Sequence, residues 1–172
     1  MTVDVQLAPL EKRYVLQNMW IAYAHELSEF HNDLPSSHGL MGEHDDEYDP
    51  ETFMAEWWAH PGGTFVYFIY VDARLAGFAL IAAPPLVDGD ADKELSEFFL
   101  FHAYRGQGVG FQAATALFNL FPGSWQLSVM DNYVSTMRFW EKTLASYTNN
   151  PVTKKSREEN GVPLTEFRFS SP

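Results

Sequence analysis

The order of apolar patterns along the chain predicts a single α/β (α+β) domain. Segments with period-two alternation are interleaved with segments of helical spacing, in the order strand, two helices, three strands, helix, strand, helix, strand. A glycine-rich connection near the middle joins an apolar strand directly to a helix. Hydrophobic residues make up 46% of the 172, and we find no repeat, low-complexity tract or dividing linker. Residues 1–172 are therefore expected to share one core.

The N-terminal part is expected to hold one strand and two helices. Apolar residues alternate with polar ones from Val3 to Leu7 and stop before Pro9, which is typical of a short strand. Helical spacing then runs to about His31, on Val15, Leu16, Met19, Trp20, Tyr23, Leu27 and Phe30. A second helix is expected to begin at Asp49-Pro50-Glu51, to carry Phe53, Trp57 and Trp58, and to end at Pro61-Gly62-Gly63.

Three strands should follow in the middle of the chain. Residues 65–71 and 75–81 are rich in aromatic and branched side chains and flank the polar turn Asp72-Ala73-Arg74, so they predict a hairpin. Pro84 and Pro85 close its second strand. Residues 94–101 then form another strongly apolar strand.

The C-terminal third is expected to contain helix, strand, helix and a final edge strand. The first helix carries a stripe of Phe111, Ala114, Leu117, Phe118 and Phe121 and stops at Pro122-Gly123. Trp125, Leu127 and Val129 alternate as a strand, residues 134–144 have helical spacing, and residues 164–169 close the chain as a strand at the edge of the sheet.

Charge and composition exclude several classes of function. A formal net charge of -12 disfavours nucleic acid, whose binding depends on clustered Lys and Arg, whereas it would favour a cationic acceptor such as an amine. We find neither an apolar run of about 18 residues nor a basic, then apolar, N-terminal stretch, so we expect a cytoplasmic protein with no membrane association. The chain has no cysteine, which excludes disulfides, a thiolate zinc site and a covalent acyl-thioenzyme. Its six histidines have no metal-ligand spacing, so we expect no metal.

The segment from Tyr104 to Gly110 carries the strongest chemical signal. Its three glycines allow a tight turn and close approach of a ligand, and the helix that follows points free N–H groups at the turn, which suits a pyrophosphate. A P-loop is excluded because Phe111 and Gln112 stand where Lys and Ser or Thr are needed. The dinucleotide motif G-x-G-x-x-G is excluded because the glycines fall at every second position.

The hexapeptide Arg105-Gly106-Gln107-Gly108-Val109-Gly110 resembles the Q/R-x-x-G-x-G/A motif of the GCN5-related N-acetyltransferase (GNAT) superfamily. Asn132, Ser135, Phe139 and Trp140 stand where that superfamily commonly has N-x-x-A-x-x-F-Y. Glu97-Phe98-Phe99-Leu100, with residues 121–126, resembles a branch of predicted bacterial acetyltransferases of unassigned substrate. The resemblance implies a mixed, strongly twisted sheet of about six or seven strands, flanked by about four helices, with the fourth and fifth strands splayed apart.

This resemblance also implies which residues bind the cosubstrate, acetyl-CoA. Backbone groups near Phe99, Leu100 and Phe101 would bond the pantetheine amides. The amides of Arg105, Gly106, Gln107, Gly108, Val109 and Gly110 would hold the pyrophosphate, with the Arg105 and Gln107 side chains as further contacts. Asn132 would either line the cofactor site or cap the next helix.

For catalysis, direct attack of an amine on the thioester needs a base, and Glu97 and Glu94 are the candidates. The resemblance implies that a backbone N–H near Leu100, on the fourth strand, would stabilise the oxyanion. Trp140 replaces the tyrosine that many relatives use as general acid, so Tyr133, Tyr147 or solvent would protonate the thiolate, unless it leaves unprotonated. In the superfamily that the chain resembles, the first helix usually borders the acceptor groove. The residues on this helix that are candidates for binding the acceptor are therefore Tyr23, His25, Glu26 and Glu29.

We therefore expect an N-acetyltransferase that moves acetyl from acetyl-CoA to a primary amine of a small molecule or peptide in a ternary complex. Two alternatives remain: a noncatalytic acyl-CoA-binding module or sensor, suggested by Trp140, and an interaction domain with an empty site. The sequence leaves monomer and homodimer open.

Overall fold

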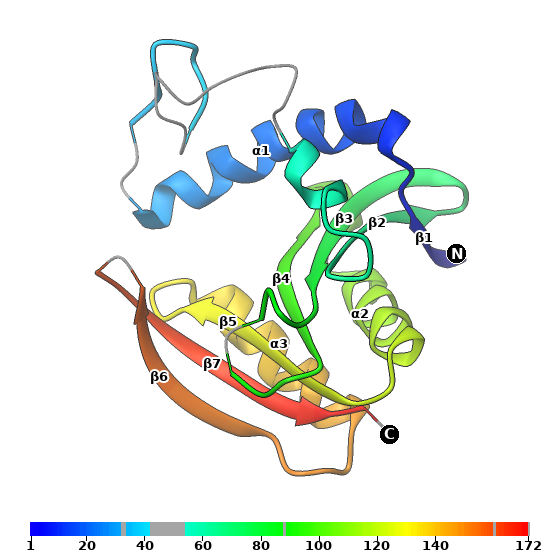
Figure 1. The fold of residues 1–172 in the computed structure, drawn as a ribbon, viewed down its shortest axis with the longest axis vertical. Helices are drawn as coiled ribbons and strands as arrows, with labels where there is room; N and C mark the ends of the chain where they lie inside the picture. The colour runs from blue at the N-terminus through cyan, green and yellow to red at the C-terminus, as the bar shows by residue number, and fades with distance from the viewer. Residues whose placement is uncertain (32–33, 42–53, 88, 160, 172) are drawn as a thin grey trace.

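Seven strands form one mixed sheet in the order β1-β2-β3-β4-β5-β7-β6 (Figure 1). The computed structural model describes residues 1–172 except 32–33, 42–53, 88, 160 and 172. Neighbouring strands are antiparallel apart from β4 and β5, which are parallel. The elements are β1 (Val3–Leu7), α1 (Arg13–His31), β2 (Thr64–Val71), β3 (Arg74–Ala82), β4 (Lys93–Leu100), α2 (Val109–Leu120), β5 (Ser124–Met130), α3 (Val134–Tyr147), β6 (Thr153–Glu159) and β7 (Val162–Ser170).

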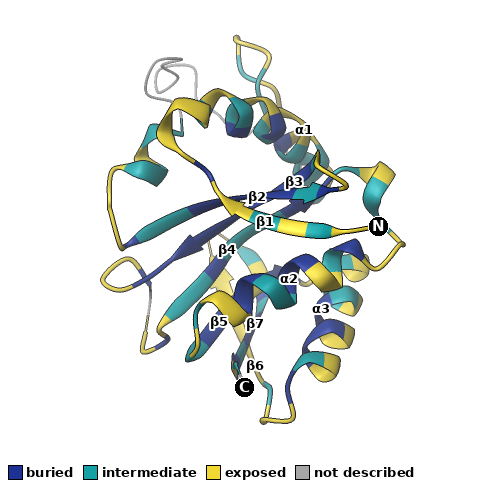
Figure 2. Ribbon diagram, turned by 90° about the vertical axis from the view of Figure 1, so that its right-hand side faces the viewer, coloured by how far each residue is buried: buried dark blue, intermediate teal, exposed yellow. Residues whose placement is uncertain are grey.

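Helices cover both faces of the sheet (Figure 2). On one face α2 and α3 pack on a core that includes Tyr67, Ile81, Trp125 and Phe167. On the other face α1 packs on the alternate residues of the same strands, in a core formed by Leu16, Met19, Val66, Phe68, Phe78, Leu80 and Phe99. The period-two alternation in β2 and β3 therefore places apolar side chains in two separate cores. Across the described residues, no helix combines the length and apolar character that a membrane span requires.

The predicted β2–β3 hairpin is confirmed. Asp72 and Ala73 at its tip both have positive φ, 48° and 64°, which is the geometry of a tight hairpin turn that follows the twist of the strands.

The prediction for the C-terminal edge was wrong. The strand expected at residues 164–169 is β7, and it lies inside the sheet between β5 and β6. The edge is β6, which the sequence analysis missed because Thr-Lys-Lys-Ser-Arg-Glu-Glu has no apolar alternation. Charged side chains suit such a position, since an exposed edge strand must avoid pairing with other chains.

The structure describes only the last part of the second predicted helix. Its expected start at Asp49 and its Phe53 lie outside the described residues. The part that follows is a short 3-10 helix, Ala55–Trp58, so the described residues contain three α-helices instead of the four expected. Trp58 is anchored by its indole N–H, which donates to the carbonyl of Ala8 at 2.8 Å.

The expected splay between the fourth and fifth strands is confirmed. The parallel ladder of β4 and β5 has three residue pairs, from Lys93 with Trp125 to Leu95 with Leu127. Beyond Leu95, β4 continues along β3 as far as Leu100 without β5 beside it. The two strands thus open into a V whose closed end is at Leu95.

Candidate active site

A groove of about 1920 Å³ occupies the V between β4 and β5. Residues 94–100 of β4 and 127–130 of β5 form its two walls. Its lining also includes residues of the glycine turn, residues along α3 from Ser135 to Ser146, and Tyr23 and Glu26 of α1. This arrangement brings most of the predicted site residues into one continuous space.

The glycine turn at the start of α2 has the geometry that an anion site requires. Gly106 and Gly108 have φ of 72° and 80°, and Gly108 is the N-cap of the helix. None of the loop hydrogen bonds of the described residues uses the amides of Gly106, Gln107 or Gly108. A Cβ built at Gly106 would meet no atom within 4 Å, so the space beside this backbone is open. Free amides at a helix N-terminus fit a phosphate group.

Gly110 has a second role, in packing α2 against α3. A Cβ built there would lie 3.0 and 3.1 Å from two carbons of the Phe139 ring. A side chain at this position would therefore require the Phe139 ring to move by a few tenths of an ångström, and glycine avoids this.

The side chains predicted to reach the pyrophosphate have other partners. The guanidinium of Arg105 donates to both oxygens of Glu26 at 2.8 and 2.7 Å, and its Nε donates to the carbonyl of Leu100 at 2.7 Å. The Arg105 amide donates to His102, and the Gln107 amide group donates to Ala103 at 2.7 Å. Both side chains therefore hold the turn in shape, and their contact with a pyrophosphate stays a prediction.

The β4 backbone refines the predicted pantetheine contacts. The amide of Phe101 donates to Ala76 at 2.9 Å, and Phe99 lies opposite Phe78 in the same antiparallel ladder. Because hydrogen bonding alternates along a strand, the amides of Phe98 and Leu100 face away from β3 and toward the groove. Phe98 thus takes the place that the sequence analysis gave to Phe99 and Phe101.

Glu97 places a carboxyl group inside the groove and receives a hydrogen bond from the hydroxyl of Tyr23. Burial raises the pKa of Glu97 to about 7; the Tyr23 hydrogen bond opposes this rise, and repulsion from Glu94 and Glu159 adds to it. Burial together with the Glu97 charge raises the pKa of Tyr23 well above its ordinary value, so its hydroxyl remains a donor. A carboxyl group that titrates near neutrality can act as a base at physiological pH.

The ring of Tyr23 is fixed by three aromatic neighbours. Its centroid lies 5.4 Å from Trp20, 5.5 Å from Phe78 and 5.6 Å from Phe99. Tyr23 is therefore a support for Glu97, and its contact with an acceptor stays a prediction.

Glu94 lies at the closed end of the V, opposite Gln126, where β4 and β5 are still paired. Its carboxylate accepts a hydrogen bond from the Gln126 side chain at 2.6 Å. Glu97 lies further along β4, where β5 is no longer paired with it. Of the two predicted bases, Glu97 is therefore better placed to reach a substrate in the open part of the groove.

The two candidate acids occupy different places. Tyr133 lines the groove and donates its hydroxyl to Glu26; burial, with this hydrogen bond, raises its pKa. Tyr147 donates to Asn119 at 2.8 Å and packs on Phe118, and it is not among the described residues that line the groove. Of the two candidate acids, only Tyr133 therefore has a place in the lining of the groove.

Trp140 is a core residue beside the groove, as predicted. Its exposed fraction is 4%, and its ring packs edge-on against Phe98 at 5.3 Å and Phe139 at 4.8 Å. Asn132 does not cap α3, because the N-cap of that helix is Tyr133. The Asn132 side-chain amide donates to the carbonyl of Phe30 at 3.0 Å, and its place beside the cofactor stays a prediction.

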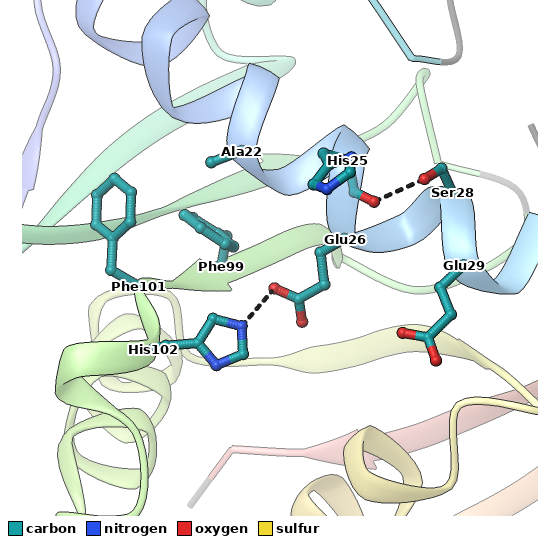
Figure 3. A pocket seen from close by; sticks show the side chains of 8 residues that line it. All are labelled: Ala22, His25, Glu26, Ser28, Glu29, Phe99, Phe101 and His102. Carbon is teal, nitrogen blue, oxygen red and sulfur yellow. Dashed lines mark hydrogen bonds and ion pairs between the residues drawn. The ribbon is translucent and has the colours of Figure 1, made fainter. Parts of the chain in front are cut away.

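A smaller pocket of about 470 Å³ adjoins the groove and shares Glu26 and Phe99 with it (Figure 3). The residues that line it include the predicted acceptor candidates His25 and Glu29. The pKa of Glu26 is lowered overall, although burial alone would raise it. The lowering comes from the hydrogen bonds that Arg105 and Tyr133 donate and from the charges of Arg105 and of His102, which lies 3.6 Å away. Glu26 is thus a paired anion.

Among the described residues, no three His, Asp or Glu side chains meet as metal ligands would. The Glu26–Arg105 pair was not foreseen, because the two residues are 79 positions apart and no local pattern connects them. The role of the Phe98 amide could have been found from strand alternation once the register was known.

A splayed parallel strand pair, an anion-binding glycine turn and a titratable carboxyl group in the same groove define an acyl-CoA-type transferase site. Residues 23–145 match the acetyltransferase (GNAT) family, and the chain belongs to this family. No curated protein matches it.

Solved structures share the whole fold. An acetyltransferase from Thermus thermophilus is 11% identical with a TM-score of 0.65, over 99% of this chain and 97% of that one. YncA from Salmonella typhimurium, solved with its cofactor acetyl-CoA, is 12% identical with a TM-score of 0.62, over 99% and 94%. The PaiA N-acetyltransferase from Thermoplasma acidophilum, in complex with coenzyme A, is 13% identical with a TM-score of 0.61, over 96% and 98%.

Proposed function

We propose that this protein transfers the acetyl group of acetyl-CoA directly to a primary amine of a small molecule or peptide. The observation that carries the proposal is Glu97, a carboxyl group with a pKa of about 7 placed in the V-shaped groove of an acetyltransferase fold. The absence of cysteine supports direct transfer, since no thiol is present to carry the acetyl group.

The residues divide the reaction between the two ends of the groove. The amides of Gly106, Gln107 and Gly108 would bind the pyrophosphate, and those of Phe98 and Leu100 would bind the pantetheine arm and the developing oxyanion. Glu97 would accept the proton from the attacking amine as the new C–N bond forms and the C–S bond breaks. The thiolate can leave as such, because a thiol has an ordinary pKa of about 8.5.

The test is acetyl transfer to a panel of amines, followed by release of the coenzyme A thiol and by mass spectrometry of the amine. Wild-type protein should acetylate at least one amine, and Glu97→Gln should lower kcat by about 10²–10⁴-fold with unchanged affinity for acetyl-CoA. Full activity of Glu97→Gln would remove this residue from the mechanism.

A noncatalytic acyl-CoA sensor is the second candidate, since Trp140 cannot serve as the acid that a tyrosine provides there in many relatives. Tight binding of acetyl-CoA with no thiol release across the amine panel would favour it over the enzyme.

A further inference from the structure

The V-shaped groove divides the sheet into two halves, β1–β4 and β5–β7–β6, that are joined differently at its two ends. At the closed end the β4–β5 ladder is reinforced by Asp92, which accepts hydrogen bonds from the amide and hydroxyl of Ser124 at 2.8 and 2.7 Å. At the open end the two strands have parted, and their separation must be set by other contacts.

Those contacts come from the C-terminal half of α1. Glu26 accepts a hydrogen bond from Tyr133, Phe30 stacks on the Tyr133 ring with centroids 4.0 Å apart and planes at 18°, and Asn132 donates to the Phe30 carbonyl at 3.0 Å. Figure 1 shows this end of α1 reaching toward the turn between β5 and α3. Glu26 and Phe30 belong to the helix that packs on β2 and β3, and Tyr133 and Asn132 follow β5, so the contacts connect the two halves.

Glu26 also connects this set of contacts to the glycine turn. Its carboxylate accepts two bonds from Arg105, whose Nε is bonded to the last residue of β4. A single paired anion thus joins α1, the end of β4 and the start of α3. A charge-assisted, bidentate pair of this kind has a fixed geometry, which makes it suited to positioning.

We infer that Glu26, Phe30, Asn132 and Tyr133 form a brace across the open end of the groove, which sets its width and so positions the thioester against Glu97. Under the proposed function, on which this inference rests, Tyr133 and Asn132 are positioning residues. Glu26 is then no contact for the acceptor, contrary to the role predicted for it from the sequence. The width of the groove matters for the rate, because displacing the thioester by about 1 Å can slow the reaction about 100-fold.

The test measures groove width and kinetics separately. The chain has no cysteine, so Arg74→Cys and Glu158→Cys, both exposed and on opposite halves, can carry two spin labels for double electron–electron resonance. Tyr133→Phe removes one hydroxyl and keeps the stacked ring, and Asn132→Ala removes the bond to Phe30. Asn119→Ala is the matched control, because it removes the hydrogen bond from Tyr147 outside the groove.

We expect Tyr133→Phe and Asn132→Ala to broaden the distance distribution and to lower kcat about tenfold or more, with unchanged coenzyme A affinity. Asn119→Ala should match the parent protein. An unchanged distance distribution overturns the brace, even if kcat falls, since Tyr133 would then act by touching the substrate. If the wild type acetylates no amine, the proposed function fails, and the distance distributions alone decide on the brace.

Discussion

Replacing Tyr23 by phenylalanine should move the acid limb of the pH–rate profile to higher pH. The hydroxyl of Tyr23 is the contact that opposes the rise in the Glu97 pKa to about 7. A hydrogen bond to a charged group contributes about 1.5–3 kcal/mol, and one pKa unit corresponds to about 1.36 kcal/mol. The limb should therefore move up by roughly one unit, and by about two at most.

The assay is thiol release against pH, with kcat/KM compared between wild type and Tyr23→Phe. The ionisation of the acceptor amine is common to both proteins, so the difference isolates the base. The phenylalanine ring keeps its contacts with Trp20, Phe78 and Phe99, and Tyr14→Phe, on the exposed side of the same helix, is the matched control. A limb that stays in place, or moves to lower pH, would refute the assignment of Glu97 as the base supported by Tyr23.

Three further predictions concern binding and stability. Gly108→Val should weaken coenzyme A binding at least about tenfold by calorimetry, because the side chain blocks the backbone at the turn. Gly62→Val is the control for backbone strain, since Gly62 has a φ of 84° and Gly108 one of 80°. Equal affinity of Gly108→Val and wild type for coenzyme A would contradict the anion site. Trp140→Ala should cost about 3–5 kcal/mol of unfolding free energy, whereas Trp140→Phe should stay folded and active; a folded but inactive Trp140→Phe would contradict the packing role. Because the pKa of Glu97 is raised from 4.5 to about 7, its protonation contributes to stability fully below pH 4.5, and this contribution is lost as the pH rises through about 7. Denaturation at about pH 8 should therefore find Glu97→Gln more stable than wild type by up to about 3 kcal/mol, with the gain absent at about pH 4.

Sequence periodicity was sufficient for most of the fold. The strands in the two cores have apolar residues on alternate positions, and the hairpin tip has polar residues, so β2, β3 and β5 were predictable from local pattern. The prediction failed for the strand at the edge of the sheet, β6. β6 is held by backbone pairing with β7 and by ion pairs such as Arg157 with the buried Glu166, neither of which leaves a local hydrophobic signal.

The candidate site was predictable where it depends on backbone geometry, and unpredictable where it depends on distant partners. The glycine turn and the strand that carries Glu97 follow from adjacent residues. The partners of Arg105 and Tyr133 do not, since both bond to Glu26 on a helix far away in the chain. Arg105 matches the family motif at its first position, and only the structure reveals that its charge is used within the protein.

The close contact at Gly110 implies a dependence between two positions that the motif alone would not suggest. The ring of Phe139 occupies the space that a methyl group at position 110 would need. The same ring stacks on Phe98, with centroids 6.1 Å apart, so a displaced ring would disturb the wall of the groove. Among related chains, the volumes of residues 110 and 139 should consequently vary in opposite directions, with alanine at 110 accompanied by a smaller side chain at 139.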